Sequence, residues 1–127
     1  TYLRAMIIID TSLWVHQLRR QGDAKKRAKV EELLLAGEAA WCAPVRLELW
    51  RGVGTDKESR VLREYEQVLP EYALNDDIWE QACNLAHRCR RQGKTAPFAD
   101  ILIAACARHH KVEVAHDDAH FVFLMVL

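Results

Sequence analysis

Three acidic residues stand in apolar surroundings that give a carboxylate little structural reason to be there. Asp10 follows the run MIII, and Glu48 lies between two leucines. Asp100 precedes the run ILIAACA, in a helical pattern that is apolar on almost every side. Because charged side chains are seldom fully buried without a partner, these acids are candidates for a metal site or for direct chemistry.

A fourth acid comes from a pair, since Asp117 and Asp118 both follow the apolar segment VEVA. One of the two should face the same crevice as Asp10, because the carboxyl ends of neighbouring parallel strands meet at one edge of a sheet. Strand pattern alone leaves the choice between them open. The candidate set is therefore Asp10, Glu48, Asp100 and one of the pair Asp117 and Asp118.

The convergence of such acids would determine their chemistry. Two carboxylates about 4 Å apart repel each other by roughly 4 kcal/mol at an effective dielectric constant near 20, so a cation must relieve the repulsion. Hard oxygen ligands favour Mg²⁺ or Mn²⁺, which also coordinate phosphate oxygens. A bound ion of this kind can turn water into a nucleophile, so the set predicts phosphodiester hydrolysis with one or two metal ions.

Taken singly, each acid also has a purely structural interpretation. Glu48 could form a salt bridge with Arg51 on the same helix. Asp100 lies in the first turn of its helix, where a negative charge favours the helix dipole.

The elements that must position these acids alternate between strands and helices. Strands are expected at 6–9, 39–43, 72–74, 112–115 and 121–127, and helices at 12–20, 24–36, 45–53, 57–69, 76–92 and 98–110. Asp10 or Thr11 caps the first helix. This alternation predicts the α/β class, as a three-layer α/β/α domain with a mostly parallel central sheet that spans residues 1–127.

Composition restricts the cellular setting. With 50% hydrophobic and 28% charged residues, the chain is typical of a globular protein, and its apolar runs are too short to cross a membrane. The segment TYLRAMIIID ends on an acid, so we interpret it as a strand rather than a secretion signal. The four cysteines form no CxxC pair, which predicts reduced, buried thiols and a cytoplasmic location.

The formal net charge is zero, so any attraction to nucleic acid must come from local patches such as KKRAK and RCRRQGK. A solvated helix face explains these patches equally well. His116 and His120 are four residues apart but in a predicted loop, which argues against a zinc site; either ring could contact phosphate or lie beside the ligands. The four tryptophans are expected in the core or at a dimer contact rather than stacked on bases.

At these residues the sequence resembles the PIN-domain family, and within it the VapC-like toxins of prokaryotic toxin–antitoxin pairs. The resemblance spans nearly the whole chain and rests on four segments in order: IIIDTSLWV, VRLELWRG, PFADILIAACA and HDDAHF. In the family's last motif an acid stands three residues before the Phe, which selects Asp118. That motif usually reads Asp, any residue, Asp, Phe, whereas here His120 replaces the second Asp.

The resemblance implies a Mg²⁺- or Mn²⁺-dependent endoribonuclease in which all four acids are catalytic metal ligands. Thr11 or Ser12 would be a supporting hydroxyl. It also implies an RNA substrate, a cognate antitoxin and a homodimer, with exposed Trp or Leu on the first and middle helices. Two alternatives remain: a non-catalytic RNA- or protein-binding module, and a phosphohydrolase with a nucleophilic Asp. The second is disfavoured because Ser12 stands where such enzymes carry another Asp.

Overall fold

Four parallel strands form the centre of the molecule, which is known here from a computed structural model describing residues 6–19 and 21–127. The strands are β1 (Ile7–Ile9), β2 (Ala39–Cys42), β3 (Glu71–Tyr72) and β4 (Glu113–Ala115), in the order β3-β2-β1-β4. The helices are α1 (Thr11–Leu18), α2 (Ala24–Leu35), α3 (Ala43–Arg51), α4 (Asp56–Val68), α5 (Asp76–Arg91), α6 (Phe98–His110) and α7 (His120–Leu124).

The sheet has the expected parallel form because its central strand is apolar on both faces. Ile8 pairs with Ala40 on one side and with Val114 on the other, and its side chain is fully buried. Strands covered on both faces read as continuous apolar runs, as MIII does. The predicted α/β class and mostly parallel sheet are confirmed.

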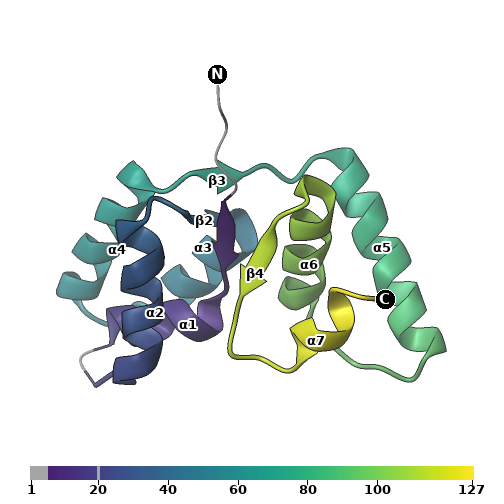
Figure 1. The fold of residues 1–127 in the computed structure, drawn as a ribbon, viewed down its shortest axis with the longest axis horizontal. Helices are drawn as coiled ribbons and strands as arrows, with labels where there is room; N and C mark the ends of the chain where they lie inside the picture. The colour runs from purple at the N-terminus through teal and green to yellow at the C-terminus, as the bar shows by residue number, and fades with distance from the viewer. Residues whose placement is uncertain (1–5, 20) are drawn as a thin grey trace.

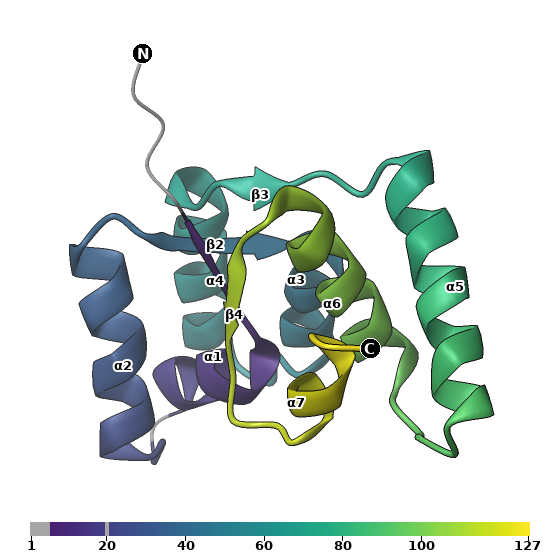
Figure 2. The ribbon, with the colours of Figure 1, turned by 45° about the vertical axis from the view of Figure 1, so that its right-hand side comes forward.

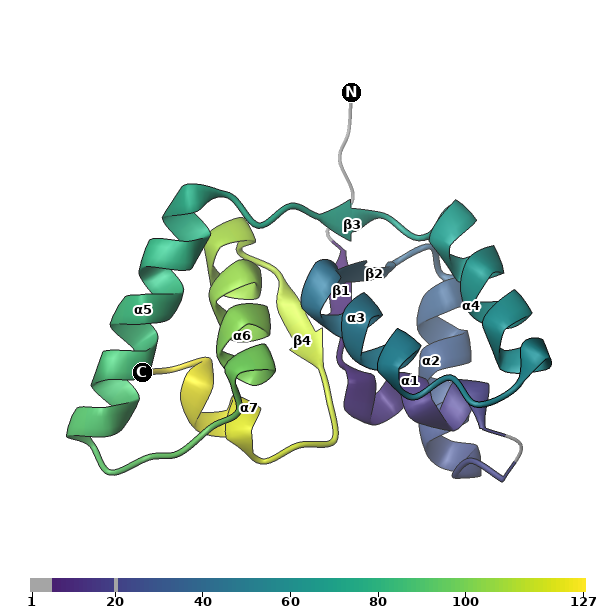
Figure 3. The ribbon, with the colours of Figure 1, turned by 180° about the vertical axis from the view of Figure 1, so that it is seen from behind.

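Helices cover the sheet on both sides. α2 lies on the near side of the molecule in Figure 1, and α3 lies on the near side in the opposite view of Figure 3. In both views α6 lies beside β4, and α5 lies outermost beyond α6. Because all the strands are parallel, the carboxyl ends of β1, β2 and β4 lie at one edge of the sheet. The segments that follow them begin there, near the start of α6.

An aromatic cluster packs on α1. The rings of Trp14 and Trp41 are fully buried with centroids 5.9 Å apart, and Tyr65 lies 5.1 Å from Trp14. The prediction that tryptophans are core residues is therefore confirmed for these two. The expectation of exposed Trp or Leu on the first helix is wrong, since Leu13 and Trp14 are both buried.

The last segment differs from its prediction. Residues 121–127 were expected as a strand, but a short helix, α7, begins at His120 and ends at Leu124. Phe121 and Leu124 are both buried while Val122 is 69% exposed, which is helical rather than alternating spacing. The expected strand at 72–74 is shorter and earlier in the structure, as β3 at Glu71–Tyr72.

Two other expectations need qualification. Cys42, Cys89 and Cys106 are buried free thiols as predicted, but Cys83 is exposed on α5. The reading of the first five residues and of Arg20 lies outside the described residues. Among the described residues, no helix is long and apolar enough to span a bilayer.

Candidate metal centre

Acids from four distant segments meet at the carboxyl edge of the sheet. One ligand atom from each of Asp10, Glu48 and Asp100 lies within 4.8 Å of the other two. Asp100, Asp118 and His120 form a second group by the same measure. We call these five residues the acid cluster; Asp100 belongs to both groups and joins them.

Asp10 is fixed by one carboxylate oxygen and leaves the other unpaired. Its Oδ2 accepts a hydrogen bond of 3.0 Å from the backbone N–H of Ser12, which caps α1. Its backbone N–H donates to the Ala115 carbonyl at 2.9 Å, so the ends of β1 and β4 are held together. The side chain is 3% exposed, yet its Oδ1 has no hydrogen-bond partner among the described residues.

Glu48 is oriented by α1 rather than by its own helix. Its Oε1 accepts a hydrogen bond of 2.9 Å from the Thr11 hydroxyl. The alternative salt bridge with Arg51 does not form in the described part of the chain, where Arg51 is exposed on α3. Thr11 therefore holds Glu48 against Asp10, as expected of a supporting hydroxyl.

Asp100 is the most perturbed of the acids. It is 5% exposed, and its Oδ2 has no hydrogen-bond partner among the described residues. Burial, followed by the negative charges of Asp10 and Asp118, raises the pKa of Asp100 from 3.8 to about 7, although His120 opposes the rise. Its carboxylate form is thus unfavourable unless a cation is nearby.

The structure brings Asp118, not Asp117, to the other acids. Asp117 forms an ion pair with Lys26 of α2, and its backbone N–H donates to the Ser12 hydroxyl at 2.9 Å. Asp118 instead turns inward, where its Oδ1 lies 2.6 Å from Nδ1 of His120. Ser12 therefore supports the loop that carries Asp118.

Of the roles that the sequence left open for His120, the structure shows a place beside the acids. Its Nδ1 lies 3.1 Å from Oδ2 of Asp100 and 2.6 Å from Oδ1 of Asp118. The available signal was its position, two residues after Asp118, where the family pattern has an Asp. His116 has a different environment, because its ring packs on Phe121 and its Nδ1 accepts the Asp118 N–H at 3.3 Å.

The acid cluster fits a divalent cation. Two buried carboxylate oxygens, Oδ1 of Asp10 and Oδ2 of Asp100, lack hydrogen bonds although unpaired buried acceptors are costly. Carboxylates that repel each other with unused lone pairs are the donors that Mg²⁺ and Mn²⁺ prefer. Four carboxylates and one imidazole are thus available to hold such an ion.

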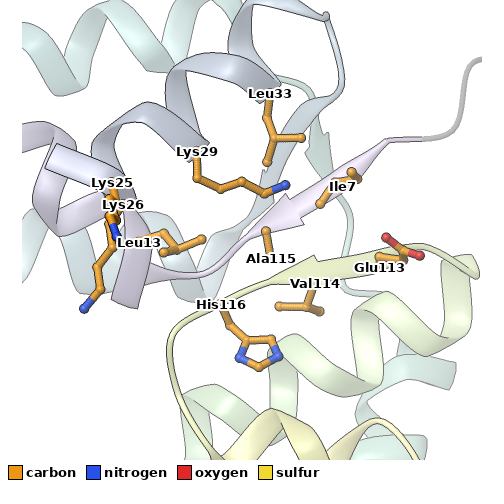
Figure 4. A pocket seen from close by; sticks show the side chains of 10 residues that line it. All are labelled: Ile7, Leu13, Lys25, Lys26, Lys29, Leu33, Glu113, Val114, Ala115 and His116. Carbon is orange, nitrogen blue, oxygen red and sulfur yellow. The ribbon is translucent and has the colours of Figure 1, made fainter. Parts of the chain in front are cut away.

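A hollow lined by lysines lies between α2 and β4, with a volume of about 420 Å³, and no residue of the acid cluster lines it. Figure 4 shows Lys25, Lys26 and Lys29 of α2 on one side and β4 with His116 on the other. Figure 2 shows the ribbons of the two elements that line this hollow, α2 and β4, from another side. The KKRAK patch thus lines a concave surface, and the pair of Lys26 with Asp117 links it to the loop of Asp118.

Comparison with known proteins agrees with this geometry. Residues 7–123 match the model of the PIN domain. The chain is 34% identical over 120 residues to VapC ribonuclease Mb1587 of Mycobacterium bovis, which covers 91% of this chain and 89% of that protein. Ribonuclease VapC11 of Mycobacterium tuberculosis matches with the same identity and coverage.

Solved structures share the fold at lower identity. FitAcB from Neisseria gonorrhoeae has a TM-score of 0.71 at 22% identity, covering 94% of this chain and 92% of that one. VapC20 of Mycobacterium tuberculosis, described as a toxin that cleaves the sarcin–ricin loop, has a TM-score of 0.69 at 21% identity, covering 92% and 93%. Given the match over 7–123 and the identity of its relatives, the chain belongs to the PIN domain family.

Proposed function

We propose that this chain is a Mg²⁺- or Mn²⁺-dependent endoribonuclease that hydrolyses RNA phosphodiesters. Its catalytic metal ligands are Asp10, Glu48, Asp100 and Asp118. It acts in the cytoplasm as the toxin of a type II toxin–antitoxin pair. The names of its relatives, VapC ribonucleases at 34% identity, support the RNA substrate and the toxin role.

The observation that carries the proposal is the pair of unpartnered carboxylate oxygens inside the acid cluster. A purely structural role would give each buried carboxylate oxygen a hydrogen-bond donor. Instead, Oδ1 of Asp10 and Oδ2 of Asp100 are buried without a hydrogen bond, although Oδ2 of Asp100 lies 3.1 Å from Nδ1 of His120. The arrangement is costly without a cation, so it is more readily explained by metal binding than by stability.

The chain's own residues have separable tasks in the reaction. When bound, a divalent ion supplies a Lewis acid and lowers the pKa of a coordinated water. Asp10 and Asp100, as the most buried acids, hold the ion, and the Thr11 hydroxyl keeps Glu48 aimed at them. The lysines of α2 bind RNA phosphates along the hollow and orient the scissile bond, since phosphate contacts dominate RNA affinity.

We further propose a homodimer and a cognate antitoxin. An exposed apolar groove of about 1010 Å³ runs along α3, the start of α5 and the start of α6. Leu47, Trp79 and Phe98 line it, and Phe98 is 88% exposed. Large apolar side chains exposed together along one groove mark an interaction surface, so we assign it to a second copy of the chain. Solved VapBC toxin–antitoxin structures of the same fold support the antitoxin as a further partner.

The function is tested by replacing Asp10 with Asn. The amide oxygen can still accept the Ser12 N–H, so α1 keeps its cap while the metal ligand is lost. Cleavage of a labelled single-stranded RNA in Mg²⁺ should fall by about a hundredfold or more. Circular dichroism should stay unchanged. RNA bound intact by the wild type, with no Mn²⁺ binding at millimolar concentration, would support the non-catalytic module instead.

A matched pair of variants tests the fourth acid. Asp118→Asn should reduce cleavage as strongly as Asp10→Asn, because Asp118 lies among the acids. Asp117→Asn removes a partly exposed ion pair with Lys26 and should leave more than about a tenth of the rate. The reverse order of effects would exclude Asp118 as the ligand.

A further inference from the structure

His120 is placed as a ligand rather than as an ordinary hydrogen-bond donor. Its Nδ1 lies between two carboxylate oxygens, 2.6 Å from Asp118 and 3.1 Å from Asp100. Neither contact has hydrogen-bond geometry: Nδ1 is buried and counts as unpartnered, as does Oδ2 of Asp100. In a simple imidazolium–carboxylate pair the N–H would point at its acceptor. Here Nδ1 lies close to both carboxylate oxygens, but no N–H points at either of them.

The distances suit a shared metal ion. Neighbouring ligands in an octahedral site with bonds of 2.0–2.1 Å are about 3 Å apart. The separations of Nδ1 from the two carboxylate oxygens, 2.6 and 3.1 Å, lie close to that value. The backbone of the loop also favours this placement, since the His120 N–H donates to Oδ1 of Asp118 at 2.9 Å and fixes one residue against the other.

We propose that Nδ1 of His120 is a metal ligand and that the acid cluster holds two chemically different subsites. This inference rests on the proposed function. One subsite contains only oxygen ligands, from Asp10, Glu48 and Asp100. The other contains two oxygens and one nitrogen, from Asp100, Asp118 and His120. Asp100, which belongs to both, bridges them.

The nitrogen ligand has a consequence for metal preference. Mg²⁺ favours oxygen ligands, whereas imidazole raises affinity for transition metals in the order Mn²⁺ below Fe²⁺ below Co²⁺. The subsite containing His120 should therefore bind Co²⁺ more tightly than Mg²⁺. The family's last motif usually has an Asp at this position. His120→Asp would therefore convert the second subsite to oxygen ligands alone.

The direct test is electron spin-echo spectroscopy of the protein loaded with two equivalents of Mn²⁺. Coupling to an imidazole ¹⁴N should be present in the wild type and absent in His120→Ala. His116→Ala is the matched control, because it removes another imidazole from the same loop and should keep the signal. No nitrogen coupling in the wild type, or its loss only in His116→Ala, would overturn the inference.

Calorimetry provides an independent measurement. The ratio of Co²⁺ to Mg²⁺ affinity should fall by about tenfold or more in His120→Asp relative to the wild type. Circular dichroism identifies variants that fail to fold. If His120→Asp does not fold, the same ratio is measured in His120→Ala. A ratio within about twofold of the wild type in both folded variants would refute a ligand role. Metal binding is measured without RNA, so the two proposals can fail separately. If the variants shift the Co²⁺ to Mg²⁺ ratio but the wild type cleaves no RNA, only the proposed function is refuted. If the wild type cleaves RNA but the variants leave the ratio unchanged, only the inference is refuted.

Discussion

Asp100→Asn should stabilise the metal-free protein, although it replaces a residue at the centre of the site. Asp100 is 5% exposed and lies among other acids, and its burial, followed by their negative charges, raises its pKa to about 7. Asn has the same shape but no charge, and its amide can donate to neighbouring carboxylates. The substitution therefore removes a repulsion that folding imposes on the ionised acid.

The size of the effect follows from the pKa. One pKa unit corresponds to about 1.4 kcal/mol, so a rise from 3.8 to about 7 amounts to about 4 kcal/mol. We expect about 2 to 4 kcal/mol at pH 8, because water and neighbouring side chains rearrange around the ionised group. Because the folded-state pKa is raised, the contribution of Asp100 to stability is greatest below pH 4 and is lost as the pH rises through 7. About a quarter of the advantage of Asn should remain at pH 4.5.

Urea unfolding in EDTA at pH 4.5 and pH 8 measures this difference. Asp77→Asn is the matched control, because Asp77 is an exposed aspartate in the first turn of α5, just as Asp100 lies in the first turn of α6. The control should be neutral or slightly destabilising at both pH values. If Asp100→Asn destabilises the metal-free protein at pH 8, or if its effect is the same at both pH values, the account of repulsion in the acid cluster is wrong.

Three other predictions follow from single contacts. Lys26→Ala should weaken RNA binding and reduce the salt dependence of the logarithm of the binding constant by about one, as measured by fluorescence anisotropy. Thr11→Val should cost about 1 kcal/mol in urea unfolding and lower the cleavage rate, because Glu48 loses its hydroxyl donor. Trp14→Ala should cost about 3–5 kcal/mol in the same assay, since it empties a fully buried site in the core. An unchanged salt dependence in Lys26→Ala, an unchanged cleavage rate in Thr11→Val or an unchanged urea midpoint in Trp14→Ala would contradict the prediction concerned.

The fold could be predicted where local patterns and tertiary packing agree. MIII forms β1 because a run of buried β-branched residues suits a strand covered on both faces. The segment FVFLMVL is also apolar at every position, but α7 forms there instead. Its two buried residues, Phe121 and Leu124, are three apart and pack on α6 and the loop. A run that is apolar at every position does not distinguish the two periodicities, so tertiary contacts decide.

The acids of the site could be identified because their surroundings in the sequence are wrong for ordinary surface carboxylates. Their hydrogen-bond partners could not. Whether Glu48 is held by Arg51 or by Thr11 depends on how α1 packs against α3, which no local pattern contains. The position of His120 was left open for a related reason: whether its ring lies beside the acids depends on α7, which begins at His120 and packs on α6.

The instability of the acid cluster and its affinity for a cation have the same physical origin. The repulsion that raises the pKa of Asp100 is present in the empty site and is relieved when a divalent ion binds. Each kilocalorie of this repulsion therefore lowers the stability of the metal-free protein and adds a similar amount to metal affinity. The aromatic cluster of Trp14, Trp41 and Tyr65 consists of other residues than the acids and can maintain the fold in the absence of metal. A PIN domain can thus keep four carboxylates in one crevice because its core is built from different residues.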